Sequence, residues 1–173
     1  NYYNLLEEID SAPFPYRVRA NVSIRRRIIS GPTASMITMR GCPYQCPFCV
    51  SGNLRGTGRK KYSKRSTDNI VKELVRLQLD GYHSVIFYDD CLFWGRKANK
   101  QIEEFCCALR TAGIGLEWTM ELRPDIFGLL TEKSFSELAE SGCKEINVGF
   151  ESASFATQKR YHKSFDSGIV KEQ

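Results

Sequence analysis

The residues best suited to chemistry are three cysteines in one short segment, Arg40-Gly41-Cys42-Pro43-Tyr44-Gln45-Cys46-Pro47-Phe48-Cys49. Their CxxxCxxC spacing lets three thiolates in one loop converge on a metal centre, and no fourth ligand lies nearby. This pattern fits an iron–sulfur cluster in which one iron is free to bind another molecule. A zinc site is the alternative, but structural zinc sites usually take four Cys or His ligands. The chain has only two histidines, His83 and His162.

The composition supports a metal protein of one domain. A chain of 173 residues can bury a sizeable core, and its apolar share of 42% is typical of a globular protein. Its seven cysteines are odd in number and partly clustered, which favours metal ligation in a reducing, cytoplasmic setting over a secreted disulfide framework. No apolar run approaches the roughly 20 residues of a membrane span. The net charge of +5 allows an anionic partner without requiring one.

The elements that must position the cysteines alternate between strand and helix from Ala34 onward. Short apolar strands are predicted at 36–39, 85–88, 116–120 and 145–150, and helices at 66–80, 97–112, 131–141 and 152–161. This alternation predicts an α/β fold of parallel βα units, specifically a partial TIM-like barrel with about four units. An open flavodoxin-like sheet is the alternative. In both architectures the functional residues lie at the carboxyl ends of the strands.

The segment 1–33 reads differently and is predicted to be an N-terminal extension of the barrel domain at 34–173. It holds a short helical turn at 4–10, a proline-containing connector at 11–17 and a strand pair at 18–29. The chain has no initiator Met and no signal-peptide pattern at its start. We therefore expect an excerpt of a longer protein.

Polar side chains follow each predicted strand. Asp89 and Asp90 follow the second strand, and Glu151 and Ser152 follow the fourth. The third strand is followed by Glu121, Arg123 and Asp125. Because parallel strands end at one rim, these groups are expected to gather beside the cysteines. Each also has a plain structural explanation, as a helix cap or a solvated loop residue.

The cysteine loop resembles the radical S-adenosylmethionine (SAM) superfamily, whose motif is CxxxCxΦC with an aromatic residue at Φ; Phe48 stands there. The resemblance extends over residues 34–161. It implies that Cys42, Cys46 and Cys49 hold a 4Fe–4S cluster on the loop after the first strand of a (β/α)6 core. It further implies that SAM binds the open iron and is cleaved reductively to a 5′-deoxyadenosyl radical. A flavodoxin- or ferredoxin-like reductant is the implied partner.

The resemblance also assigns roles to the rim residues. Phe48 would stack on adenine. Independently of the resemblance, Arg123 is expected to pair with a carboxylate on the rim or to contact the cofactor. The family's Gly-Gly-Glu motif, which holds the methionine amino group, is absent, so Asp89 or Asp90 would take that role. Glu151 and Ser152 would reach the ribose hydroxyls or the methionine end of SAM.

Three segments indicate which branch of the superfamily the chain resembles: Arg40-Gly41-Cys42-Pro43, Phe87-Tyr88-Asp89-Asp90 and Gly149-Phe150-Glu151-Ser152. They are similar to the cobalamin-dependent and methylthiotransferase branches, which implies hydrogen abstraction or radical-assisted methyl transfer. It also implies cobalamin on a preceding domain of the parent protein. The alternatives are a methylthiotransferase acting on RNA or protein, and a non-catalytic iron–sulfur or zinc module. About two of the family's six units are missing, so we expect C-terminal truncation, an oligomer or a partner chain that completes the barrel.

Two further features stay open. Cys91 could be a catalytic thiol or a ligand of a second cluster, although a buried small hydrophobe is the favoured interpretation. The segment 55–65 carries six basic residues and no acid. It could bind RNA or a phosphate-bearing substrate, but a solvated loop is favoured.

Overall fold

The fold is built on a parallel four-stranded sheet. In the computed structural model, residues 9–17, 31–53 and 62–163 are described. The sheet has the order β1-β4-β5-β6, with β1 at Thr33–Met36, β4 at Ser84–Phe87, β5 at Glu117–Leu122 and β6 at Cys143–Val148. Every neighbouring pair is parallel. Because these strands follow one another in chain order, the arrangement matches successive βα units of a barrel rather than the reversed order of an open doubly wound sheet.

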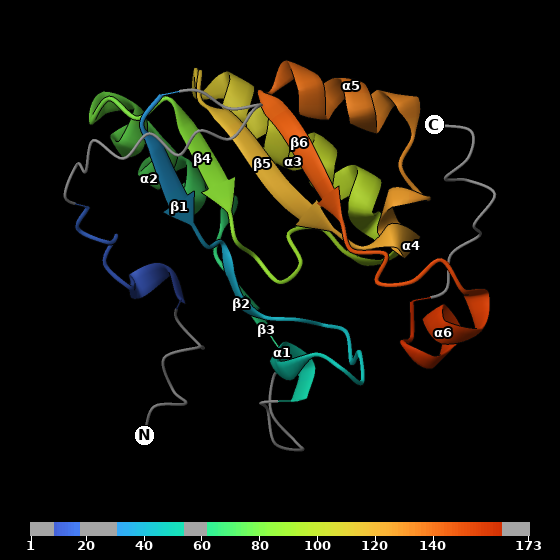
Figure 1. Ribbon diagram of the computed structural model, residues 1–173. Coiled ribbons are helices and arrows are strands. Elements are labelled where there is room, and N and C mark those ends of the chain that lie inside the picture. The colour runs from blue at the N-terminus through green and yellow to red at the C-terminus, as the bar shows by residue number, and fades with distance from the viewer. Residues whose placement is uncertain (1–8, 18–30, 54–61, 164–173) are drawn as a thin grey trace.

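Three helices cover one face of this sheet (Figure 1). They are α2 at Thr67–Leu79, α3 at Ala98–Thr111 and α5 at Glu132–Glu140. Helix α2 begins where Ser66 accepts a hydrogen bond from the Asn69 amide, and α5 begins where Thr131 accepts one from the Ser134 amide. Ser and Thr are favoured at this position because the side-chain oxygen satisfies an amide that has no partner within the helix. None of the helices within the described ranges is long and apolar enough to cross a bilayer.

The core lies between the sheet and these helices. Alternate residues of the central strands, among them Phe87 and Trp118, point into it and are about 1% exposed. The Trp118 ring meets the edges of Phe87 and Phe105 at centroid distances of 5.6 and 5.8 Å. Its indole N–H donates to the Ser141 carbonyl at 2.9 Å. The partial α/β barrel predicted from the sequence is confirmed, and this packing fixes the strand ends that carry the polar residues.

The single strand predicted at 36–39 is wrong in detail. The chain instead leaves β1 at Met36 and enters a separate strand, β2 at Met39–Gly41, which pairs antiparallel with β3 at Tyr62–Lys64. Between them, the amides of Thr38 and Met39 both donate to one oxygen of Asp89. These amides therefore bond to a side chain and not to the backbone of a neighbouring strand, and the chain leaves the four-stranded sheet at this point.

Several short elements were not predicted. They are α1 at Val50–Asn53, β3, η3 at Gly95–Lys97 and α4 at Pro124–Phe127. The helical turn predicted at 4–10 overlaps η2 at Ile9–Ser11, and its first five residues lie outside the described ranges. The predicted helix at 152–161 is shortened to α6 at Phe155–Arg160, with Ser154 as its N-cap. Elements of three to six residues carry too few periodic positions to be recognised from the sequence pattern.

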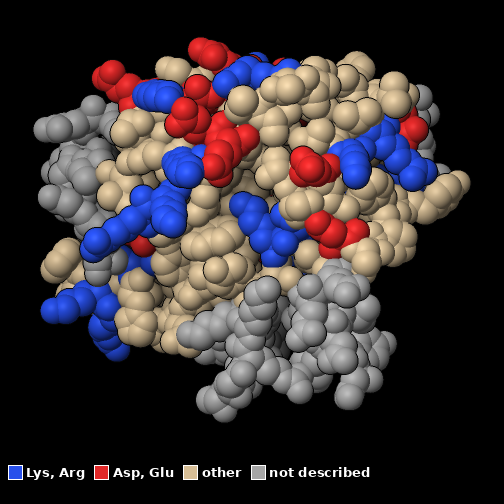
Figure 2. Space-filling model, turned by 180° about the vertical axis from the view of Figure 1, so that it is seen from behind, with Lys and Arg blue, Asp and Glu red and all other residues tan. Residues whose placement is uncertain are grey.

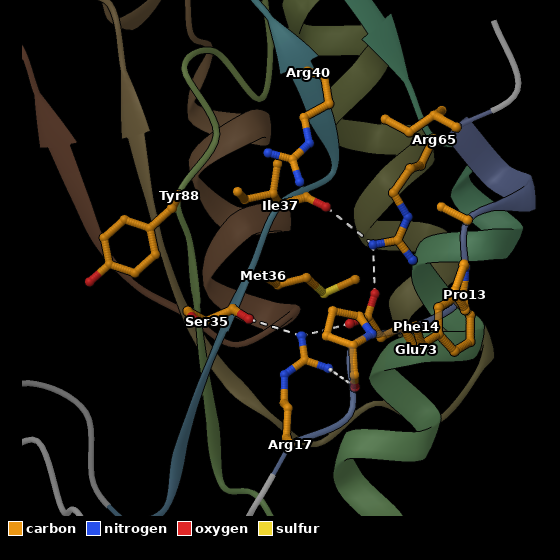
Figure 3. Close-up of a pocket in the computed structure, with 13 residues that line it drawn as sticks. Pro13, Phe14, Arg17, Ser35, Met36, Ile37, Arg40, Arg65, Glu73 and Tyr88 are labelled. Carbon is orange, nitrogen blue, oxygen red and sulfur yellow. Dashed lines mark hydrogen bonds and ion pairs between the residues drawn. The ribbon is translucent and has the colours of Figure 1, made fainter. Parts of the chain in front are cut away.

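The described part of the N-terminal connector, residues 9–17, packs on α2 and on the free edge of β1. Arg17 donates to the Ser35 carbonyl of β1 at 3.0 Å. Arg17 and Arg65 form ion pairs with opposite oxygens of the buried Glu73, at 2.7 and 2.6 Å (Figure 3). This Arg–Glu–Arg cluster ties the connector to the barrel edge. The strand pair predicted at 18–29 lies outside the described residues.

Candidate functional site

The loop between β2 and α1, which carries the three cysteines, lies beyond the carboxyl ends of the parallel strands (Figure 1). Their loop leaves β2 through Gly41, whose φ of 81° favours a residue without a side chain. The loop closes in a turn in which the Cys49 amide donates to the Cys46 carbonyl at 3.0 Å. Helix α1 then carries the chain away. The cysteines are therefore displayed on a tight turn above the sheet rim, as the βα alternation predicts.

A cavity of about 200 Å³ separates this turn from the ends of β5 and β6. Cys42, Cys46 and Cys49 all line it. Four of the six other predicted site residues line it as well: Phe48, Asp90, Arg123 and Glu151. The fold thus brings together residues that are up to 109 positions apart in the sequence.

The donor set fits an iron–sulfur cluster. In a cubane cluster each cysteine binds a different iron, so three ligands need to line one cavity without meeting at a single ion. Within the described ranges, no group of three or more His, Cys, Asp or Glu side chains is arranged to hold one metal ion. The cavity leaves room beside the three thiols.

Two of the cysteines have polar neighbours within hydrogen-bond distance. A hydrogen bond from Cys91 is the main cause that lowers the pKa of Cys42 from 9.0 to about 7, and burial acts in the opposite direction. The Sγ atom of Cys46 accepts a hydrogen bond from Arg123 at 3.0 Å. Metal ligation needs the deprotonated form of Cys. These contacts therefore suit the thiols to the role of cluster ligands.

Cys91 is buried, as the favoured interpretation predicted, and it also contacts a cysteine of the motif. Its pKa is raised, chiefly because it is hydrogen-bonded to Cys42 and because it is buried. Its thiol lies 3.2 Å from the Phe93 carbonyl. Cys91 thus forms a hydrogen bond with Cys42, the first cysteine of the motif, without lining the cavity itself.

The two aspartates after β4 separate into different roles. Asp90 is exposed, lines the cavity and accepts a hydrogen bond from Ser51 of α1 at 2.8 Å. Asp89 is 2% exposed, does not line the cavity and accepts from the Thr38 and Met39 amides at 2.7 Å each. Burial raises the pKa of Asp89 to about 6. The structure therefore places Asp90 at the cavity and Asp89 beneath the start of β2.

The two residues after β6 also separate. Glu151 lines the cavity with a left-handed backbone, at a φ of 59°. A non-glycine residue there carries strain of about 1 kcal/mol or more, and such residues are frequent at functional sites. Ser152 does not line the cavity, and its hydroxyl accepts from the Ser154 amide at 3.1 Å. It shapes the turn that leads into α6.

One cavity residue had no signal in the sequence. Lys163 is 6% exposed, and its ammonium donates to the Gly149 carbonyl at 2.6 Å and to Glu151 at 2.9 Å. It also lies 5.3 Å from the centroid of the half-exposed Phe48 ring. Nothing in its local pattern marks it, because its position depends on how the chain returns after α6.

A second, smaller hollow of about 130 Å³ lies on the sheet face opposite the helices. Tyr88, Glu121 and Asn147 line it. Glu121 also lines the cysteine cavity, and Asn147 is its partner in the β5–β6 register. This face therefore offers polar groups close to the cysteines.

The described part of the basic segment is engaged within the protein. Lys64 donates to the Leu92 carbonyl at 3.3 Å and lies over the Trp94 ring, and Arg65 is held by Glu73. Residues 55–61 lie outside the described ranges. On the face seen in Figure 2, basic and acidic side chains are interspersed. The RNA-binding alternative for this segment thus stays a prediction.

Comparison with known proteins gives relatives named as methyltransferases or methylases and, over a shorter stretch of 62 residues at 36% identity, the ribosomal protein uS12 methylthiotransferase RimO of Thermosynechococcus vestitus. The chain is 27% identical over 151 residues to an uncharacterized methyltransferase of Pyrococcus horikoshii, covering 87% of this chain and 31% of that protein. It is 26% identical over 147 residues to the hopanoid C-3 methylase of Methylococcus capsulatus, covering 83% of this chain and 27% of the methylase. The chain therefore spans about a third or less of these relatives.

The fold also matches a solved structure. The cobalamin-dependent SAM radical enzyme OxsB superposes with a TM-score of 0.63 at 21% identity, covering 78% of this chain and 20% of OxsB. At this identity the likeness concerns the fold alone. The family model of the radical SAM superfamily matches residues 36–169, which include the cysteine loop and the polar segments that follow the other three strands of the sheet. The chain therefore belongs to the radical SAM superfamily, whose members bind a 4Fe–4S cluster and SAM.

Proposed function

We propose that this chain is the catalytic core of a radical SAM methyltransferase. The observation that carries the proposal is the shared cavity, in which Cys42, Cys46 and Cys49 face the polar ends of β5 and β6. The relatives named methyltransferase and methylase favour methyl transfer over other radical SAM reactions. The fold shared with OxsB is consistent with cobalamin as a second cofactor, carried elsewhere in the parent protein.

In this proposal the three cysteines ligate the cluster, which when bound supplies one electron for reductive cleavage of SAM. Phe48 offers a ring that is 49% exposed and faces the cavity, suited to stacking on adenine. Asp90 and Glu151 offer carboxylates to the amino group or the ribose hydroxyls of SAM. In this proposal Arg123 holds the cysteine loop and does not bind a carboxylate of SAM. Its donors are already hydrogen-bonded to Asp125, Cys46 and the His162 carbonyl.

Asp89 and Ser152 act indirectly in this proposal. Asp89 holds the amides that open β2, and Ser152 holds the turn before α6. The electron would come from a flavodoxin- or ferredoxin-like protein in the cytoplasm. The substrate would enter from the open sheet face, where Tyr88, Glu121 and Asn147 lie.

The test is anaerobic reconstitution of the chain with iron and sulfide, followed by dithionite and SAM. We expect a 4Fe–4S absorbance and EPR signal that changes when SAM is added, and formation of 5′-deoxyadenosine or of a methylated product in the presence of cobalamin. Cys46→Ala should abolish both the cluster and the product. Cys107→Ala is the matched control, because Cys107 is exposed and lies on α3 away from the cavity.

Two outcomes would contradict the proposal. One is stoichiometric zinc in place of iron. The other is a cluster whose spectrum is the same with and without SAM. Either would favour the alternative of a non-catalytic metal module.

A further inference from the structure

The guanidinium group of Arg123 contacts one sulfur of the cysteine motif directly. Its Nη1 atom donates to Cys46 Sγ at 3.0 Å, its Nε to Asp125 Oδ1 at 2.9 Å and its Nη2 to the His162 carbonyl at 2.8 Å. The plane of the group lies over the Tyr44 ring, 3.8 Å from the centroid. Three nitrogens thus have three different partners.

These contacts fix a positive charge in one place. Arg123 is 8% exposed, and a planar guanidinium held at all three nitrogens cannot rotate away without breaking its bonds. Arginine side chains are not deprotonated in proteins, so this group stays a cation.

The positively charged Arg123 is also distant in sequence from the cysteine loop that it contacts. Arg123 stands at the end of β5, 77 positions after Cys46, and its third partner, His162, follows α6. The same side chain therefore joins the cysteine loop, the rim of the sheet and the segment that carries Lys163 into the cavity.

We infer that Arg123 is a positioning residue that raises the reduction potential of the 4Fe–4S cluster through its hydrogen bond to Cys46. The inference depends on the proposed function, in which Cys46 ligates the cluster. Reduction adds one electron from the external reductant to the cluster, with no bond made or broken. A cationic N–H donor on a ligand sulfur stabilises the more negative, reduced state more than the oxidised state. Hydrogen bonds to sulfur and local charge are established determinants of such potentials.

The consequence is a cluster that a biological reductant can reduce more readily. Without the cation, the same reductant would leave a larger share of the clusters oxidised. Arg123 would in this way control how often the site is ready to cleave SAM, without touching SAM itself.

The experiment is a potentiometric titration of the reconstituted chain, with the EPR signal of the reduced cluster as the readout. Arg123→Gln should shift the midpoint downward. At the potential where the wild type is half reduced, we expect the ratio of reduced to oxidised cluster to fall about tenfold, which corresponds to about 59 mV for one electron. Arg123→Lys keeps a cation but loses the fork of donors, so we expect a smaller shift in the same direction.

Arg110→Gln is the matched control, because Arg110 also pairs with a carboxylate, Glu137, but lies between α3 and α5 away from the cavity. Its midpoint should equal that of the wild type. An Arg123→Gln protein with wild-type cluster content and a wild-type midpoint would overturn the inference. If Arg123→Gln does not hold a cluster, the midpoint of Arg123→Lys decides: a lower value supports the inference, and an unchanged value overturns it. A wild-type chain that assembles no SAM-responsive cluster would instead contradict the proposed function.

Discussion

Asp89 allows a test of whether a single buried carboxylate holds the start of the cysteine-bearing segment. Its Oδ1 atom accepts from the Thr38 and Met39 amides, and the side chain is 2% exposed. Replacing it with Asn keeps an acceptor oxygen for both amides but removes the charge. Replacing it with Ala removes the acceptor as well. The two variants therefore separate the effect of the hydrogen bonds from the effect of the charge.

The expected magnitudes follow from the pKa. Burial raises the pKa of Asp89 from 3.8 to about 6, against the amides of Met39 and Thr38, the Thr38 side chain and Lys64, which favour the ionised form. Between these two pH values the folded chain binds a proton that the unfolded chain has lost. This difference in proton binding contributes to the free energy of unfolding. The contribution is fully present below pH 3.8 and is lost as the pH rises through about 6. At pH 7 the buried charge therefore costs about 3 kcal/mol.

The assay is urea unfolding of the reduced, metal-free chain at pH 4, 5.5 and 7. Asp89→Asn should raise the free energy of unfolding at pH 7 by up to about 3 kcal/mol, and the difference from wild type should nearly vanish at pH 4. Asp89→Ala should lower the free energy of unfolding by about 2–6 kcal/mol at pH 4, because two buried amides lose their acceptor, and by about 3 kcal/mol less at pH 7, because the buried charge is removed as well. Asp80→Asn, at an exposed i,i+4 pair, is the control and should change it by less than about 0.5 kcal/mol. The reasoning is refuted if Asp89→Asn is less stable than wild type at pH 7, or if both show the same pH dependence.

Two further predictions concern stability away from the cysteines. Glu73→Gln should lower the free energy of unfolding by about 3 kcal/mol, because it leaves two guanidinium groups without their buried counter-charge. In the same urea assay Glu103→Gln, at an exposed pair, should have little effect, and equal losses for the two variants would contradict the importance of burial. Trp118→Phe should cost about 2–4 kcal/mol, since it leaves a cavity and removes the donor to the Ser141 carbonyl. A calorimetric melting temperature within about 2 °C of wild type would refute that estimate.

The sequence by itself determined the elements whose signals are local. The helix caps at Ser66 and Thr131 are set by side chains that bond amides three residues later, so they can be recognised in a short window. The alternation of apolar strands and amphipathic helices is equally local, and it sufficed to predict parallel βα units. The cysteine spacing and Phe48 were enough to identify the superfamily that the family model matches.

Only the tertiary structure decided which polar rim residues reach the cavity. Asp89 and Asp90 are adjacent and chemically identical, but successive side chains after a strand point in opposite directions, and packing sends one inward and the other to the cavity. Arg123 was expected to pair with a carboxylate on the rim and does so with Asp125, but nothing in the sequence indicated its contact with Cys46. Lys163 had no signal at all. Such contacts join residues far apart in the chain, so they depend on where the folded elements come to lie.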